Sequence, residues 1–484
     1  MATPRTALAP SGPSSGGVHH RSGRRKRWIE HWEPEDDTFW ATTGRRVARR
    51  NLVWSIFAEF LGFSVWLSWS VVAIRLNDAG FDFSSGQLFT LVAVPNLVGA
   101  TARFPYTFAV PRFGGRNWTI VSALLLLIPT VLLAVLVTDP STPYWALLAA
   151  AATAGLGGGN FASSMANISF FYPNARKGVA LGLNAAGGNL GVAVLQLVAP
   201  FAVAAGALAV VGGGQGAGGV LHLQNVGLML IPFILAAAFC AWRFMDNLVT
   251  ARSSFRDQAV VAKRRHTWTM AWLYVGTFGS FIGYSAGLPL LIKGQFADPN
   301  AIKYAFLGPL VGSITRPVGG WLADRLGGAR VTLCNFGVMM VAVGGVMYFL
   351  ANKEQSWAFA GFLAMFLVLF VATGVGNGST FRMVPIIFRA HHSGADVGAV
   401  DDAAITAGRR ESAAALGIIS AVGAYGGFLI PQTFGLSTNA TGGPQAAFVS
   451  FIAFYGSCMV LTWWCYLRSR VAVERLPNLA WARP

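Results

Sequence analysis

GLGGGNFASSMANISFFYP, at residues 155–173, is a run of small and polar residues inside a longer apolar segment. In water each helical glycine costs about 1 kcal/mol relative to alanine, so this stretch would make a poor soluble helix. In a membrane, small residues let another helix or a ligand come close to the backbone. The stretch therefore predicts a membrane helix built for a close approach.

The composition indicates an integral membrane protein. The 484-residue chain is 54% hydrophobic and 11% charged, whereas an average soluble domain is about 25% charged. Apolar runs long enough to cross a bilayer recur from end to end, which predicts an all-α fold with many spans. The net charge of +17 does not indicate nucleic-acid binding, because the basic residues gather in the tails and short loops.

Nothing in the sequence predicts a cofactor or an enzyme. None of the seven histidines lies inside an apolar run, and the four cysteines look like packing residues. We find no zinc-protease, phosphate-loop or nucleophile-elbow motif. Neither a metal, a haem nor a covalent catalytic mechanism is therefore expected.

Twelve transmembrane helices are predicted, and their even number places both termini on the same side of the membrane. Of the 36 Lys and Arg residues, only Arg75, Lys293, Lys303 and Lys353 are expected in loops on the opposite side. Basic loops remain in the cytoplasm, so both termini are predicted to be cytoplasmic in an inner (plasma) membrane protein. The predicted spans are 51–76, 86–111, 118–138, 143–172, 178–205, 225–246, 268–292, 302–323, 330–350, 357–388, 411–435 and 447–468.

A charged connector between the sixth and seventh spans divides the chain into two six-helix halves. The predicted organisation is a largely disordered cytoplasmic tail at 1–48, an N-terminal half at 49–246, a cytoplasmic linker at 247–267, a C-terminal half at 268–470 and a cytoplasmic tail at 471–484. Within the first tail, EHWEPEDDTFW at 30–40 is a candidate ordered collar. The tail has no apolar core of a secretory signal.

The two halves repeat one another. Arg103 and Arg316 each lie eleven residues before a Gly-Gly pair, in the second and eighth spans. GLGGGNF at 155–161 matches GVGNGSTF at 374–381, and LGLNAAGGNLG at 181–191 matches LGIISAVGAYGG at 416–427. Matched features in the same order predict a duplication with a pseudo-two-fold axis along the membrane normal.

Arg103 and Arg316 are charges inside the membrane, where each costs at least about 2.5–3.5 kcal/mol. One explanation is a structural ion pair, but the spans contain few acids, chiefly Glu59 and Glu411, so at most one arginine could be compensated. The other is a shared anion site, because a planar guanidinium fork binds a planar oxyanion through two charge-assisted hydrogen bonds. The arginines alone do not separate nitrate from formate, bicarbonate or sulfate.

Four motifs together resemble the nitrate/nitrite porter family of the major facilitator superfamily: the 155–173 stretch, FGSFIGYSAG at 278–287, GVGNGSTF at 374–381 and LGIISAVGAYGGFLIP at 416–431. WLADRLGGARV at 321–331 is similar to the loop after the eighth span of that superfamily. The resemblance extends over nearly the whole chain from about residue 30. It implies a twelve-helix major facilitator fold and transport of nitrate and nitrite by a monomer without a cofactor.

The resemblance also implies a set of substrate-binding residues. They are Arg103 and Arg316 as the anion ligands, Phe161, Tyr274 and Phe278 as rings that sandwich the flat anion, and Asn189 as an amide contact. Ring faces and amide donors suit a flat, weakly hydrated anion better than a tetrahedral one. Each ring or amide could instead be packing or a contact between helices.

Further residues are candidates for coupling and gating. Glu59 departs from the family pattern, because it is an acid in the first span. It is a candidate proton carrier, a candidate partner for an arginine, or part of the cytoplasmic entrance. Asp324 and Arg325 are expected to clamp helix ends on the cytoplasmic side, and Gly157 and Gly376 to let helices slide. The predicted function is alternating access with nitrate/nitrite antiport. The alternatives are a nitrate/proton symporter that uses Glu59, an anion channel and a nitrate sensor.

Overall fold

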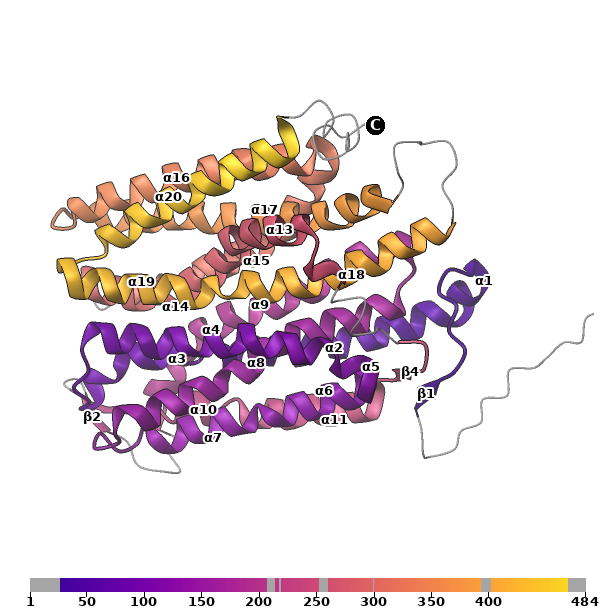
Figure 1. The fold of residues 1–484 in the computed structure, drawn as a ribbon. Helices are drawn as coiled ribbons and strands as arrows, with labels where there is room; N and C mark the ends of the chain where they lie inside the picture. Colours follow the sequence, from indigo (N-terminus) through magenta and orange to yellow (C-terminus); the bar gives the residue numbers. More distant parts are fainter. Residues whose placement is uncertain are drawn as a thin grey trace, which may run out of the picture.

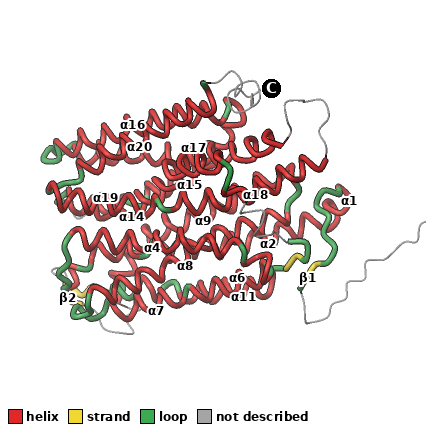
Figure 2. Tube along the Cα trace, viewed as in Figure 1, coloured by secondary structure: helices red, strands yellow, loops and turns green. Residues whose placement is uncertain are grey.

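The computed structural model describes residues 27–206, 214–216, 219–251, 260–298, 300–392 and 402–468. Within these residues the chain is almost entirely helical, and the long helices run side by side along one axis (Figures 1 and 2). The first and last described residues lie at the same end of this bundle (Figure 1). We call it the tail end, and its opposite the far end.

The N-terminal half contains the helical segments α1 to α11 and four short strands. Its elements are β1 (Trp28–Ile29), α1 (Asp37–Phe39), η1 (Trp40–Gly44), α2 (Arg45–Trp66), α3 (Trp69–Val72), η2 (Ala73–Arg75), η3 (Asn77–Ala79), α4 (Ser85–Thr107), α5 (Ala109–Phe113), α6 (Gly115–Leu125), α7 (Leu127–Leu136), α8 (Tyr144–Phe171), α9 (Asn174–Ala204), β2 (Gly214–Gly216), β3 (Gly219–Leu221), α10 (Asn225–Leu228), α11 (Ile231–Phe244) and β4 (Asn247–Leu248).

The C-terminal half follows the linker and contains the remaining helices. They are α13 (Arg265–Tyr274), η5 (Val275–Gly279), α14 (Ser280–Gln295), η6 (Ala301–Tyr304), α15 (Leu307–Leu326), α16 (Gly328–Ala351), α17 (Ala358–His392), α18 (Asp402–Ala424), α19 (Gly426–Thr441), α20 (Gln445–Thr462) and η7 (Trp463–Leu467).

The predicted all-α membrane architecture is confirmed, and each of the twelve predicted spans coincides with a helical segment. Ten segments of the described chain are long and apolar enough to cross a membrane. The other two, α8 and α15, have 28 and 20 residues, which is sufficient length. Their mean hydropathy is lower because α8 carries the glycine and asparagine run and α15 carries Arg316, Asp324 and Arg325.

Glycines bring helices into backbone contact at equivalent places in the two halves. In the first half, a Cβ atom at Gly155 of α8 would lie 2.7 Å from the Pro95 carbonyl oxygen of α4. In the second half, a Cβ atom at Gly374 of α17 would lie 2.3 Å from the Gly312 carbonyl oxygen of α15. Because only glycine fits such crossings, the 155–173 stretch and its repeat pack the arginine-bearing helices directly against their neighbours.

Residues 27–44 fold across the tail end of the first half. Strand β1 pairs in parallel with β4, with Trp28 opposite Asn247. The indole Nε1 of Trp32 donates to the Phe170 carbonyl oxygen at 3.1 Å, and Trp32 and Trp40 are both buried. An ordered collar is therefore present in this part of the expected tail. Helix α2 begins at Arg45, earlier than the predicted start at residue 51, because its first turns extend beyond the apolar run.

Other parts of the predicted organisation lie outside the described residues. These are residues 1–26 of the first tail, residues 252–259 of the linker and the tail at 471–484.

Candidate anion-binding site

Arg103 is fully buried at the centre of the bundle and touches both halves. Its Nε donates to the Gly158 carbonyl oxygen of α8 at 3.1 Å, and its Nη1 donates to the Ser420 carbonyl oxygen of α18 at 2.8 Å. Its Nη2 has no hydrogen-bond partner among the described residues. The guanidinium is thus held in place by two carbonyl groups while one nitrogen keeps unused donors.

Arg316 occupies the equivalent position in α15 and is 4% exposed. Its Nη2 donates to the Tyr274 hydroxyl at 3.3 Å, whereas its Nη1 has no partner in the described part of the chain. Both predicted arginines are therefore buried, and each retains a donor nitrogen without a protein acceptor.

Aromatic rings connect the two arginines. The Phe161 ring of α8 lies under both guanidinium groups, with its centroid 4.6 Å from Arg103 Cζ and 5.7 Å from Arg316 Cζ. Phe278 stacks on Phe161 at a centroid distance of 5.8 Å, and Tyr274 stacks on Phe278 at 5.3 Å. We call these five residues the arginine–ring cluster. Ring faces attract cations, so the rings support the guanidinium groups without neutralising them.

A π-helical turn places Tyr274 and Phe278. Tyr274 ends α13 and Phe278 lies in η5, a π-helical segment of five residues. Such turns interrupt α-helices mostly at functional sites, because they re-aim the side chains around them. Here the two rings lie nearly parallel, at an interplanar angle of 18°.

The two arginines are not paired with acids. Among the described residues, no carboxylate oxygen lies within 4 Å of a nitrogen of either guanidinium group. Glu411 instead pairs with Arg264 at 3.0 Å. Glu59 accepts hydrogen bonds from Ser164 and from Asn184. Glu59 acts on both arginines electrostatically, but from beyond 4 Å. A buried charge without a close partner is costly, and no close ion pair to either arginine is present in the described part of the chain.

The remaining predicted ligand, Asn189 of α9, is 1% exposed. Neither polar atom of its side-chain amide has a hydrogen-bond partner among the described residues. Its amide atoms are therefore available to a ligand, but Asn189 makes no hydrogen bond to the arginine–ring cluster in the described part of the chain.

The predicted gating residues lie away from the cluster or serve packing. Asp324 of α15 accepts from Arg382 Nε of α17 at 2.6 Å, and both side chains are about half exposed at the tail end. Arg325 Cζ lies 4.2 Å from the Trp321 ring centroid. A Cβ atom at Gly157 would lie 2.2 Å from the Gly62 carbonyl oxygen, and one at Gly376 would lie 2.5 Å from Asn335 Nδ2. These two glycines mark tight helix contacts.

Two neighbours of the cluster were not predicted. The Trp66 ring centroid lies 5.3 Å from Arg103 Cζ, and that of Phe381 lies 5.6 Å from Arg316 Cζ. The internal repeat could have predicted Phe381. Phe381 is the last residue of GVGNGSTF, just as Phe161 is the last residue of the matching GLGGGNF. No comparable signal marks Trp66.

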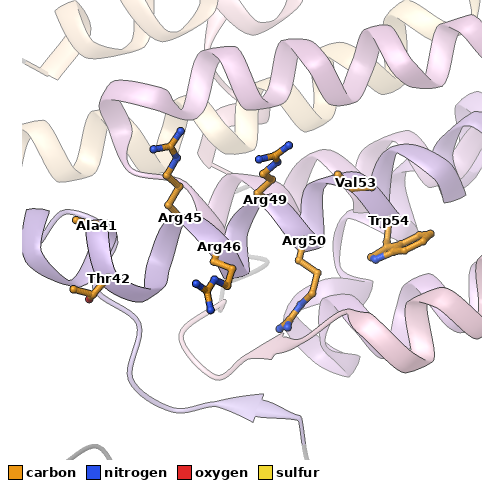
Figure 3. Close-up of a pocket in the computed structure, with 8 residues that line it drawn as sticks. All are labelled: Ala41, Thr42, Arg45, Arg46, Arg49, Arg50, Val53 and Trp54. Atoms are coloured by element: carbon orange, nitrogen blue, oxygen red, sulfur yellow. The ribbon is translucent and has the colours of Figure 1, made fainter.

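A separate cavity of about 470 Å³ lies at the tail end of α2. It is lined by Ala41, Thr42, Arg45, Arg46, Arg49, Arg50, Val53 and Trp54 (Figure 3). Arg45 and Arg49 point to one side of α2, and Arg46 and Arg50 to the other. Arg50 pairs with Asp246 at 2.5 Å. These arginines belong to the basic tail end and not to the buried cluster.

The long apolar helices define a polytopic membrane protein. The sequence profile described as Major Facilitator Superfamily matches residues 52–408. The Nitrate/nitrite transporter NarU of Escherichia coli K12 is 44% identical over 447 residues, which cover 91% of this chain and 96% of that protein. The Probable nitrate/nitrite antiporter NarK2 of Thermus thermophilus is 38% identical, covering 91% and 97%. The chain belongs to the nitrate/nitrite porter family of the major facilitator superfamily.

The fold also matches a solved transporter structure. A bacterial homologue of the human lysosomal transporter Spinster, in an inward-facing and unoccupied conformation, superposes with a TM-score of 0.64. The alignment has 13% sequence identity and covers 90% of this chain and 99% of the other. The predicted major facilitator fold is therefore confirmed, and the curated relatives named above are transporters, not enzymes.

Proposed function

We propose that this chain carries nitrate and nitrite across the inner membrane by alternating access, in exchange for one another. One observation carries the proposal: Arg103 and Arg316 are buried against one ring, that of Phe161, and no carboxylate oxygen of the described residues lies within 4 Å of either guanidinium group. The relatives named nitrate/nitrite transporters and antiporters support the choice of anion. The excess of basic residues at the tail end supports cytoplasmic termini.

The chemistry of the cluster suits a flat monovalent anion. Arg103 Nη2 and Arg316 Nη1 offer donors that no described protein group accepts. The stacked rings of Phe161 and Phe278 form an apolar wall that a weakly hydrated anion tolerates. A sulfate ion would have to lose much more hydration there, with fewer flat contacts in return.

Exchange follows from the repulsion between the two guanidinium groups. Arg103 is repelled by Arg316, and Glu59 offsets this repulsion only when its carboxyl group is ionised. When an anion is bound, its charge screens that repulsion, whereas the empty carrier would have to bring the two cations together to close. We therefore expect the loaded carrier to change sides much faster than the empty one.

Counterflow in proteoliposomes tests this exchange. Labelled nitrate should enter vesicles preloaded with nitrite at least about tenfold faster than it enters empty vesicles. This ratio corresponds to a barrier for the return of the loaded carrier that is about 1.4 kcal/mol lower than the barrier for the empty one. Equal rates in both would contradict exchange. A flux far above carrier turnover without acceleration by internal nitrite would indicate a channel, and nitrate binding without any flux would indicate a sensor.

Proton symport is a second candidate, because Glu59 is a buried acid with no basic nitrogen within 4 Å among the described residues. Arg103 and Arg316 act on it electrostatically from farther away. Glu59 is 1% exposed on α2, and its Oε1 has no partner among the described residues. Its other oxygen accepts from the hydroxyl of Ser164, which in turn lies 2.9 Å from the hydroxyl of Ser55 one turn nearer the tail end. This chain of hydroxyl groups could pass a proton toward the cluster.

The Glu59→Gln variant separates the two candidates. If exchange is the mechanism, we expect nitrate/nitrite exchange to stay within about threefold of the unaltered rate, since glutamine keeps the hydrogen bonds of an uncharged carboxyl group. Uptake driven by an imposed pH gradient, and its loss in Glu59→Gln, would instead favour symport. Glu354→Gln, an exposed acid at the far end, is the matched control.

A further inference from the structure

Basic residues are scarce at the far end of the bundle, yet two of them meet at one carboxylate. The Nζ of Lys293 donates to Asp78 Oδ1 at 2.7 Å and to the Ile74 carbonyl oxygen at 2.5 Å. Arg75 Nη1 lies 3.2 Å from the other oxygen, Asp78 Oδ2.

The two bonds to Asp78 differ in what they connect. Lys293 lies in the last turn of α14, in the C-terminal half, whereas Asp78 lies in η3 and Ile74 in η2, in the N-terminal half. The Lys293 contacts therefore tie one half to the other. The Arg75–Asp78 pair joins residues three apart in the same half, so it orients the carboxylate without joining the halves.

Further hydrogen bonds join the halves on the same side of the arginine–ring cluster. Gln196 Nε2 of α9 donates to the Ser285 carbonyl oxygen of α14 at 2.7 Å. Thr90 of α4 donates to Gln432 Oε1 of α19 at 3.2 Å. Together with Lys293, these bonds hold the halves in contact between the cluster and the far end.

We propose that Lys293 is a gating residue, which locks the far end of the carrier closed by bridging to Asp78 and the Ile74 carbonyl group. The proposal rests on the proposed alternating access, since an anion released at the far end can leave only after these contacts break. The Lys293 and Asp78 side chains are each about one-third exposed. Partly hydrated ion pairs are weak, which suits a lock that must open in every transport cycle.

Thiol labelling in nanodiscs measures the opening directly. Cys240, Cys334, Cys458 and Cys465 are first replaced, and Thr90→Cys is introduced as the reporter on the contact between α4 and α19. We expect Lys293→Met to raise the maleimide labelling rate at position 90 about two- to fivefold, the range for loss of a partly exposed ion pair. Lys293→Arg should stay near the unaltered rate.

Arg75→Met is the matched control, because it removes a partner of the Asp78 carboxylate without breaking a contact between the two halves. Labelling that is unchanged in Lys293→Met, or raised as much in Arg75→Met, would overturn the proposal. The labelling experiment needs no nitrate, so it tests the Lys293 proposal independently of the exchange proposal. Either proposal can therefore be contradicted while the other is supported.

A cross-link gives a second measurement that does not depend on the stability of the lysine variant. Asp78→Cys and Lys293→Cys are joined by a flexible, reducible bifunctional thiol reagent. We expect exchange to fall at least about tenfold and to return on reduction. A cross-linked protein that exchanges at the full rate would overturn the proposal.

Discussion

Replacing Arg103 or Arg316 by lysine should lower nitrate/nitrite exchange by at least about 30-fold, since loss of a buried, charge-assisted contact costs about 2–5 kcal/mol. Arg103 divides its donors between the Gly158 and Ser420 carbonyl oxygens and a free Nη2. A lysine ammonium group is compact and lacks the planar fork, so it would keep the charge and lose this geometry. The measurement is counterflow of labelled nitrate into vesicles loaded with nitrite.

The control for this substitution is Arg243→Lys. Arg243 is an exposed residue in the last turn of α11, with its Cζ 5.3 Å from the Phe244 ring centroid, and its replacement should leave exchange within about twofold, as expected for an exposed site. Near-normal exchange in Arg103→Lys or Arg316→Lys would contradict a site that both guanidinium groups share.

Gly157→Ala should destabilise the folded carrier by about 1–3 kcal/mol, the usual cost of overpacking. The new methyl group would lie 2.2 Å from the Gly62 carbonyl oxygen, so α8 and α2 would have to separate. Gly319→Ala should act alike in the second half, because its methyl group would lie 2.1 Å from the Val375 carbonyl oxygen. Thermal unfolding in detergent, followed by tryptophan fluorescence, measures the effect as a lower Tm.

Gly182→Ala supplies the comparison for this prediction. Gly182 also lies in a membrane helix, α9, but a Cβ atom there would have no neighbour within 4 Å. Alanine at that position should leave the Tm unchanged or raise it, since alanine is the better helix former. If Gly157→Ala and Gly182→Ala gave the same Tm, the tight crossing would not matter to stability.

The order and approximate extent of the helices could be predicted from the sequence, because hydropathy reports which segments cross a bilayer. Two helices show the limit of that signal. In α8 and α15 polar and charged residues lower the mean hydropathy, so these two spans give the weakest hydropathy signal of the twelve. Hydropathy also did not predict where helices are interrupted. The end of α2 at Trp66 and the π-helical turn at Val275–Gly279 depend on packing that periodicity does not reveal.

Part of the candidate anion site could also be predicted, because some of its residues contrast with the sequence around them. Two arginines at matched positions of a repeat stand out in an apolar background, and the family resemblance pointed to Phe161, Tyr274 and Phe278. Contacts between distant segments had no such signal. Lys293 and Asp78 are 215 residues apart in the chain, and only the packing of one half on the other brings them together.

The choice of partner for each acid also required the structure. Glu59 and Glu411 were both available to pair with an intramembrane arginine. In the structure Glu411 pairs with Arg264 at the tail end, and Glu59 is held by Ser164 and Asn184. That arrangement leaves Arg103 and Arg316 without a carboxylate within 4 Å among the described residues, and the proposed anion site rests on this observation.

The most direct test is a calorimetric titration of the purified chain with nitrate, repeated with the Arg103→Lys/Arg316→Lys double variant. We predict saturable binding of one nitrate per chain, little or no binding of sulfate, and loss of nitrate binding in the double variant although it unfolds at a similar temperature. Undiminished nitrate binding in that variant would contradict the claim that the two arginines hold the anion.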